Sequence, residues 1–345
     1  MSPLQWGLWI SAAALLAGLA GHSAWLDYRA RRLRRSQSSV ETAPVEPRAL
    51  DASDDWDTPH LGSPGIGLSP GERKPTLDAL IDAITPIVLE NPVSGDAVLA
   101  ALPATRRVGS KPFAVEGLNA GSQQWEPIAA GQRYTALQAG LQLASRAGPI
   151  NDIEFSEYVM KTQALCDALG ATPEFPDMRH EVARARELDQ FASACDAQLG
   201  ITLRARRSAW SPSFVQQVAE RHGFVPGAVA GRLVLPVAQG EAPLLGLAFD
   251  TQAALADDLS LSALREVRLS LDVAHVPRQH NAFARMHEIA FRLAQVMDAH
   301  VTDDAGLVLT PDALASVAQE LEQLYDVFEQ HDIPTGSALA RRLFS

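Results

Sequence analysis

Cysteine, lysine and, beyond residue 36, basic residues in general are scarce in this 345-residue chain. The two cysteines, Cys166 and Cys195, fall in segments that we expect to be helical. They give no disulfide framework and no cysteine metal site, so we expect two buried thiols. After Ser36 the sequence holds 24 basic and 40 acidic residues, a net charge of about −16. Binding to a phosphate backbone needs a basic face, so we expect no nucleic-acid partner.

Motifs of several common catalytic sites are also missing. The sequence has no P-loop and no C-x-x-C pair. His287-Glu288 could begin a zinc-protease motif, but Phe291 stands where the second histidine ligand belongs. His275, His280 and His287 are close in sequence, yet such histidines are more often ordinary surface or core residues than ligands. We therefore expect a binding protein and not an enzyme, with no cofactor, no metal and no small-molecule substrate. A membrane-bound hydrolase without a visible motif is the alternative from a different class.

The N-terminal segment is apolar. Residues 4–26 contain no charged side chain. As a helix they would extend roughly 34 Å, enough to cross a hydrocarbon core. Trp6, Trp9 and Trp25 lie near the two ends, where an indole favours the headgroup region. A cleavable export signal carries its basic residues before the apolar run, and here they follow it. We predict a transmembrane anchor over residues 1–28.

Basic residues follow the apolar run directly. They are Arg29, Arg31, Arg32, Arg34 and Arg35. Such a flank stays in the cytoplasm, so the predicted orientation places the N-terminus outside and the rest of the chain inside the cell. Residues 29–76 form this basic juxtamembrane segment and then a proline-rich, acidic linker. The linker has little periodic hydrophobicity, so we expect it to be disordered.

Residues 77–196 and 197–332 are predicted to be two similar α+β units. In both, a strand is followed by a helix, three extended runs and two helices. Each unit is large enough for an antiparallel sheet with helices on one face. The offset between matching residues drifts along the chain, which indicates a diverged duplication at best. Residues 333–345 form a C-terminal tail.

The second unit has the clearest local signals. Its expected helices begin at Ser211-Pro212 and Thr310-Pro311, where a hydroxyl cap precedes a proline. Its expected strands cover residues 199–206, 228–236, 244–249 and 267–273. A helix is expected over residues 282–300 and a short extended run over 306–309. The last helix should bury one stripe, made of Leu314, Val317, Leu321, Leu324 and Phe328.

The whole plan resembles the ZipA family of bacterial cell-division proteins. The shared features are the anchor, the basic flank, the acidic linker and the C-terminal α+β domain. The local likeness is best where the helix over 282–300 is followed by Val301-Thr-Asp-Asp-Ala-Gly-Leu-Val-Leu309 and then by Thr310-Pro311-x-x-Leu314. Gly306 and the Thr-Pro start are its most specific residues. The resemblance covers the anchor, the linker and residues 197–332. The short linker and the extra unit depart from the family.

The resemblance implies a single-pass inner-membrane protein of septum assembly. It would bind the C-terminal tail of the tubulin-like protein FtsZ and hold filaments at the cytoplasmic face of the lipid bilayer. In the family, the open sheet face binds this peptide. The candidate partner-binding residues on that face are Arg204, Ala230, Arg232, Val234, Leu244, Ala248 and Ser270. A membrane-anchored adaptor of another envelope or signalling complex is the alternative function.

This set is more polar than a site for an apolar peptide should be. Either the strand phase is shifted by one residue, or the first unit supplies the surface through Phe113, Trp125 and Tyr134. Both explanations stay open at this point.

The tail allows two interpretations. Asp332-Ile333-Pro334, followed by an apolar residue and Arg341-Arg342, resembles the FtsZ tail peptide. A tethered mimic of that peptide would compete strongly, because a short link gives it a high effective concentration. The alternative, which we favour, is a helix stop at Pro334 and an amphipathic end that packs on the domain.

Overall fold

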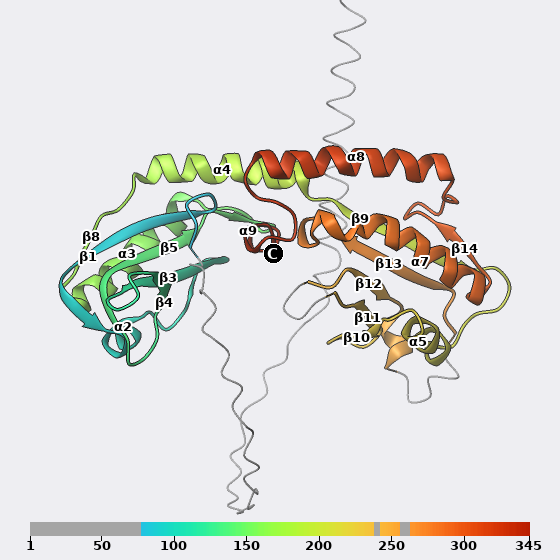
Figure 1. The fold of residues 1–345 in the computed structure, drawn as a ribbon, viewed down its shortest axis with the longest axis horizontal. Coiled ribbons are helices and arrows are strands. Elements are labelled where there is room, and N and C mark those ends of the chain that lie inside the picture. Colours follow the sequence, from blue (N-terminus) through green and yellow to red (C-terminus); the bar gives the residue numbers. More distant parts are fainter. Residues whose placement is uncertain (1–76, 238–241, 256–262) are drawn as a thin grey trace, which may run out of the picture. The chain divides into compact units, whose positions relative to one another are not determined.

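The computed structural model describes residues 77–237, 242–255 and 263–345. This part of the chain is mixed α+β, with antiparallel sheets and helices packed on them (Figure 1). The predicted anchor, its basic flank and the linker lie outside the described residues. Among the described helices, none combines the length and the apolar character that crossing a bilayer requires.

The first sheet has three long strands at its centre and short ones at its edges. Its strand order is β2-β3-β5-β1-β8, with β4 also paired to β3. The strands are β1 (Asp82–Ser94), β2 (Arg107–Val108), β3 (Lys111–Asn119), β4 (Trp125–Pro127), β5 (Arg133–Gln142) and β8 (Thr172–Pro173). A separate pair is formed by β6 (Ala144–Ser145) and β7 (Gly148–Pro149).

Three helices accompany this sheet, namely α2 (Gly95–Ala101), α3 (Asp152–Leu169) and α4 (Met178–Cys195). A capping box of Asn151 and Glu154 begins α3. Tyr158 on α3 is fully buried, and its hydroxyl lies 2.7 Å from Thr85 Oγ1 and 3.0 Å from the Ala139 carbonyl oxygen. Desolvation raises the pKa of Tyr158 above its usual value, so the hydroxyl stays a neutral link between helix and sheet.

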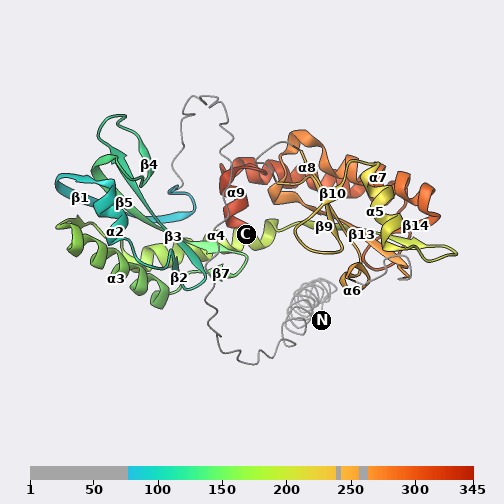
Figure 2. The ribbon, with the colours of Figure 1, turned by 90° about the horizontal axis from the view of Figure 1, so that it is seen from below.

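The second sheet has the strand order β10-β11-β12-β13-β9-β14. Its strands are β9 (Gln198–Ala205), β10 (Val225–Pro226), β11 (Arg232–Leu235), β12 (Leu245–Ala248), β13 (Glu266–Asp272) and β14 (Ala299–Thr302). The helices are α5 (Pro212–Glu220), α6 (Thr251–Ala254), α7 (Ala282–Met297) and α8 (Pro311–Gln330). As predicted, Ser211 and Thr310 cap α5 and α8. Helix α7 packs on β9, β13 and β14, and α5 lies beside α7 (Figure 2).

The two sheets share one route of the chain. In each sheet the first strand, β1 or β9, has a neighbour on both sides. One neighbour is the last long strand before the long helix α3 or α7, namely β5 in the first sheet and β13 in the second. After that helix, the chain returns as a short strand on the other side of the first strand, β8 in the first sheet and β14 in the second. The orders β2-β3-β5-β1-β8 and β11-β12-β13-β9-β14 are therefore equivalent.

Three expected elements of the second unit were partly wrong. Helix α7 ends at Met297 and not at residue 300, because Asp298 adopts a left-handed conformation with φ of 49°. Residues 299–302 pair with β9 instead. Residues 306–309 form only a single bridge, between Val308 and Thr302. The run 228–236 is a strand only at Arg232–Leu235, because a turn with φ of 76° at Gly231 precedes it.

The last helix buries less than expected. In α8, Leu321 and Phe328 are buried as predicted, whereas Leu314, Val317 and Leu324 are only partly buried. All the buried residues of α8 lie in its C-terminal half.

The C-terminal tail is part of the core. It contains α9 (Ala338–Leu343), and Ile333, Leu343 and Phe344 are buried. They share one apolar cluster with Ile81, which directly precedes β1, with Ala144 of β6, and with residues of α4 and α8, namely Ala192, Cys195 and Phe328. The guanidinium of Arg342 lies 2.6 Å and 3.0 Å from the two carboxylate oxygens of Asp82 in β1. The tail thus packs on the folded chain, as the favoured interpretation states, and mimicry of the FtsZ tail stays a prediction.

Both cysteines are buried and unpaired, as expected. Burial raises the pKa of the Cys166 thiol to about 11 and raises that of Cys195 as well. Neither thiol is therefore activated as a nucleophile or metal ligand at neutral pH.

Candidate partner-binding surface

The two faces of the second sheet differ because side chains alternate along each strand. In β13, Val267, Leu269 and Leu271 are buried in the core, whereas Arg268 and Ser270 are exposed on the opposite face. The phase expected from the sequence is the phase observed in this strand. Helices cover the apolar face, and we call the other side the open face.

Four of the seven candidate residues are neighbours on the open face. Val234 in β11 lies opposite Gly246 in β12, which lies opposite Ser270 in β13. In the next row, Arg232 lies opposite Ala248, and Ala248 opposite Arg268. Adjacent strands are about 4.8 Å apart, so one extended peptide can reach Arg232, Val234, Ala248 and Ser270 together.

Arg204 lies on the same face, further from this group. It is on β9, opposite Glu266 in β13 and His300 in β14. Its Nε atom is 3.4 Å from the Glu266 carboxylate, and 43% of its side chain is exposed. Its charge is therefore partly balanced within the sheet.

Two candidates do not belong to the open face. Leu244 has 0% exposure, and its backbone N–H donates to the Leu235 carbonyl at 2.8 Å. Its expected placement was wrong, because Leu245 is also buried and the alternation begins only within β12. Ala230 is exposed, but it lies in the turn before β11.

An acidic turn lies over one part of the open face. Arg268 Nη2 is 2.7 Å from Asp304 Oδ2. Asp304 also lies above Gly200 of β9, where a Cβ atom would come within 2.5 Å of its Oδ1. Both side chains of the pair are about half exposed, at 54% and 52%, so the pair contributes little stability. A bound anionic group can therefore compete with Asp304 for Arg268 at little energetic cost.

The first sheet carries an apolar row on its outer face. Across the strands β1, β5, β3 and β4, Val88 lies opposite Ala136, Ala136 lies opposite Leu118, and Leu118 lies opposite Trp125. Val88 is 52% exposed, and the other three are partly buried. Of the residues expected to supply an apolar surface, Phe113 and Tyr134 are instead buried in the core. Trp125 is the one that lies on this row.

The start of the described chain covers a neighbouring part of that face. Leu77 lies over Gly140, where a Cβ atom would come within 2.3 Å of the Leu77 side chain. The Leu77 N–H donates to Glu116 Oε1 at 3.2 Å, and Gln138 Nε2 donates to the other carboxylate oxygen at 2.9 Å. The sequence did not reveal this face, because Ile84, Pro86 and Val88 are as apolar as Ala83, Ile87 and Leu89, which alternate with them.

The histidines do not form a site. His287 lies on α7, and His275 Nδ1 is 3.6 Å from Asp272 Oδ2. Within residues 77–237, 242–255 and 263–345, no three His, Cys, Asp or Glu side chains are placed to hold a metal ion.

The open face therefore offers small and apolar side chains between arginines, a chemistry suited to an extended peptide with apolar and acidic residues. No protein-family model matches this chain, and no curated protein matches it.

Proposed function

We propose that this chain is a single-pass membrane protein that binds the C-terminal tail of FtsZ and tethers division filaments to the cytoplasmic face of the inner membrane. The observation that carries the proposal is the open face, where Arg232, Val234, Ala248 and Ser270 lie side by side opposite a helix-covered face. Gly306 and the Thr310-Pro311 helix start, the most specific residues of the resemblance to the ZipA family, lie in the same unit. Residues 1–28 would be the anchor and 29–76 the linker.

The proposed mechanism uses weak contacts. The tail peptide would lie across β11, β12 and β13, with its apolar side chains on Val234 and Ala248 and its carboxylates near Arg232 and Arg268. The anchor confines the domain to a thin layer below the bilayer, and a filament presents many tails. Effective concentration then makes modest single-site affinities sufficient.

We also propose that residues 77–196 and 197–332 are diverged copies of one unit. The equivalent strand orders and the shared chain route support this. The second unit is the proposed peptide binder, because its open face combines apolar and cationic side chains. The outer face of the first unit presents mainly an apolar row, without matching arginines in that row.

A new negative charge on the open face should weaken peptide binding. Arg232→Glu and Val234→Glu should each raise the dissociation constant of a fluorescent FtsZ tail peptide at least tenfold, about 1.4 kcal/mol, measured by anisotropy with the full chain. Neither side chain is buried, so the fold should be kept, which circular dichroism checks. Val88→Glu on the first sheet is the matched control and should leave the affinity unchanged.

Other outcomes identify other functions. If only Val88→Glu weakens binding, the first unit is the binder and our assignment of the site is wrong. If the unmodified chain does not bind the peptide at all, the FtsZ proposal fails and the adaptor of another complex becomes the better explanation.

A further inference from the structure

The N-terminal half of α8 carries an apolar stripe that is not fully covered. Leu314 and Val317 are only partly buried, whereas Leu321 and Phe328 of the same stripe are buried. An amphipathic helix normally hides its whole apolar stripe against the core. Here the stripe faces α7 across a gap.

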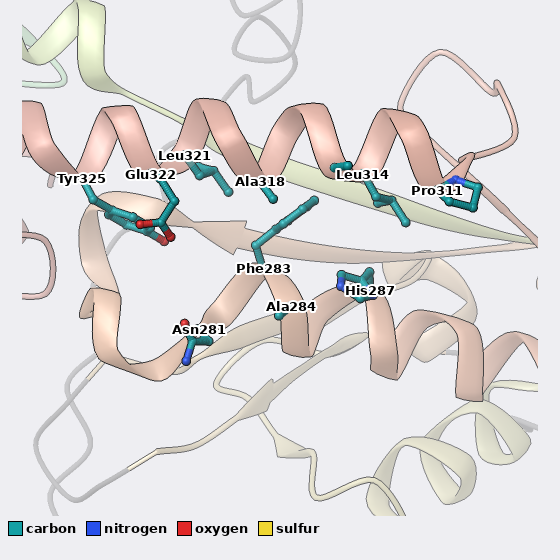
Figure 3. A pocket seen from close by; sticks show the side chains of 11 residues that line it. Asn281, Phe283, Ala284, His287, Pro311, Leu314, Ala318, Leu321, Glu322 and Tyr325 are labelled. Atoms are coloured by element: carbon teal, nitrogen blue, oxygen red, sulfur yellow. The ribbon is translucent and has the colours of Figure 1, made fainter.

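That gap is a cavity of about 370 Å³ between α7 and α8 (Figure 3). Figure 3 shows Leu314, Ala318 and Leu321 of α8 directed toward Phe283 and His287 of α7. We call this cavity and its rim the α7–α8 groove. Small residues keep it open, namely Ala284, Ala315 and Ala318. Its size is sufficient for a few large apolar side chains from a partner.

One carboxylate, that of Glu322, lines the groove itself, and helix α8, which forms one wall of the groove, is acidic as a whole. Helix α8 has five carboxylates and no basic residue: Asp312, Glu320, Glu322, Asp326 and Glu329. Arg278 lies 2.5 Å from Glu322, 2.9 Å from Asp326 and 3.1 Å from Glu329, so one cation faces three of them. The α7 side is closer to neutral, since Arg292 pairs with Glu288 at 2.6 Å and Arg285 adds one exposed cation.

This distribution of charge determines which kind of partner can bind in the α7–α8 groove. A second copy of the chain would bring another acidic α8 to the rim, and the like charges would repel. A positively charged segment is instead attracted by the carboxylates of α8. An apolar groove between two helices fits a helix with apolar side chains spaced three and four residues apart.

We propose that the α7–α8 groove binds a cationic amphipathic helix of a partner protein. Its apolar side chains enter the cavity beside Ala315 and Ala318, and its lysine or arginine side chains face the carboxylates of α8. Because α7 packs on the covered face of the second sheet, this site lies on the other side of that sheet from the open face. The chain can then hold an FtsZ tail and a second partner at once.

The probe is a synthetic helical peptide of leucine and lysine, with the leucines on one face. Its receptor is the full chain in nanodiscs of phosphatidylcholine. An Ala315→Cys variant carries an environment-sensitive fluorophore on the rim, since Cys166 and Cys195 are buried. We expect a saturable shift of the emission, with a dissociation constant on the order of micromolar. The local label distinguishes groove binding from binding to the lipid.

The variant Ala318→Leu fills the cavity and should weaken binding at least tenfold. Ala318 is exposed, so the variant should fold, and an unchanged thermal melt verifies this. Ala313→Leu adds the same side chain to the same helix outside the cavity lining and should leave the affinity unchanged. A peptide with glutamate in place of lysine should bind at least tenfold more weakly.

Three results would overturn the proposal. One is the lack of a saturable shift, and another is equal binding by the Ala318→Leu variant. The third is a shift that depends on protein concentration without any peptide and is lost in Ala318→Leu, which would make the groove a contact between two copies.

Discussion

Replacing Phe344 by alanine should lower the free energy of unfolding of the chain by about 3–5 kcal/mol. The ring is fully buried, 5.4 Å from the ring of Phe328 between centroids, in the cluster that joins the tail to Ile81 and Ala192. Removing it leaves a cavity that packed neighbours fill only in part. Urea unfolding of the full chain measures the change.

The matched control is Phe291→Ala on α7, which removes the same atoms from a side chain that is 40% exposed. It should cost less than about 1 kcal/mol, because little apolar area leaves a buried environment. If Phe344→Ala costs no more than this control, the tail is not part of the core. A tail that mimics the FtsZ tail peptide then becomes the better interpretation.

Replacing Arg342 by alanine should cost about 3–5 kcal/mol, because it leaves the Asp82 carboxylate buried without its cation. The Asp82 side chain has 0% exposure, and its desolvation raises the pKa above 3.8 even with Arg342 present. Without Arg342 the pKa should rise further. The folded state then binds the proton more tightly than the unfolded state, so the variant should lose stability as the pH rises above 3.8.

A double-mutant cycle separates the ion pair from packing. Adding Asp82→Asn to Arg342→Ala should recover much of the loss, because the buried charge is gone while an amide oxygen can still accept from the Asp78 N–H. Losses that simply add in the double variant would contradict the assigned pair.

Local signals predicted the parts of the fold that depend on neighbouring residues. The alternation of Val267, Leu269 and Leu271 gave β13 within a residue or two and its correct phase. The caps Ser211 and Thr310 placed the starts of α5 and α8. Strand alternation and helix capping depend only on residues that are close together in the sequence, so a short stretch of sequence predicts them.

The failures involve contacts between distant segments. Packing of the amphipathic tail on the domain was the favoured interpretation, but the contacts of Leu343 and Phe344 with Ile81 and α4, more than 140 residues away in the chain, follow from no local pattern. Leu244 was misplaced because its environment depends on the pairing with Leu235 across a loop. The apolar row through Val88 was missed because β1 is apolar in both phases. The α7–α8 groove exists because small alanines leave space between two helices, whose packing against each other follows from no local pattern.

The central claim is that this chain holds FtsZ filaments, and co-sedimentation with assembled FtsZ tests it most directly. The full chain in nanodiscs should pellet with filaments of intact FtsZ and stay in the supernatant with filaments that lack the C-terminal tail. The Arg232→Glu variant should stay in the supernatant with both. Equal pelleting with intact and tailless filaments, or none with either, would contradict the account.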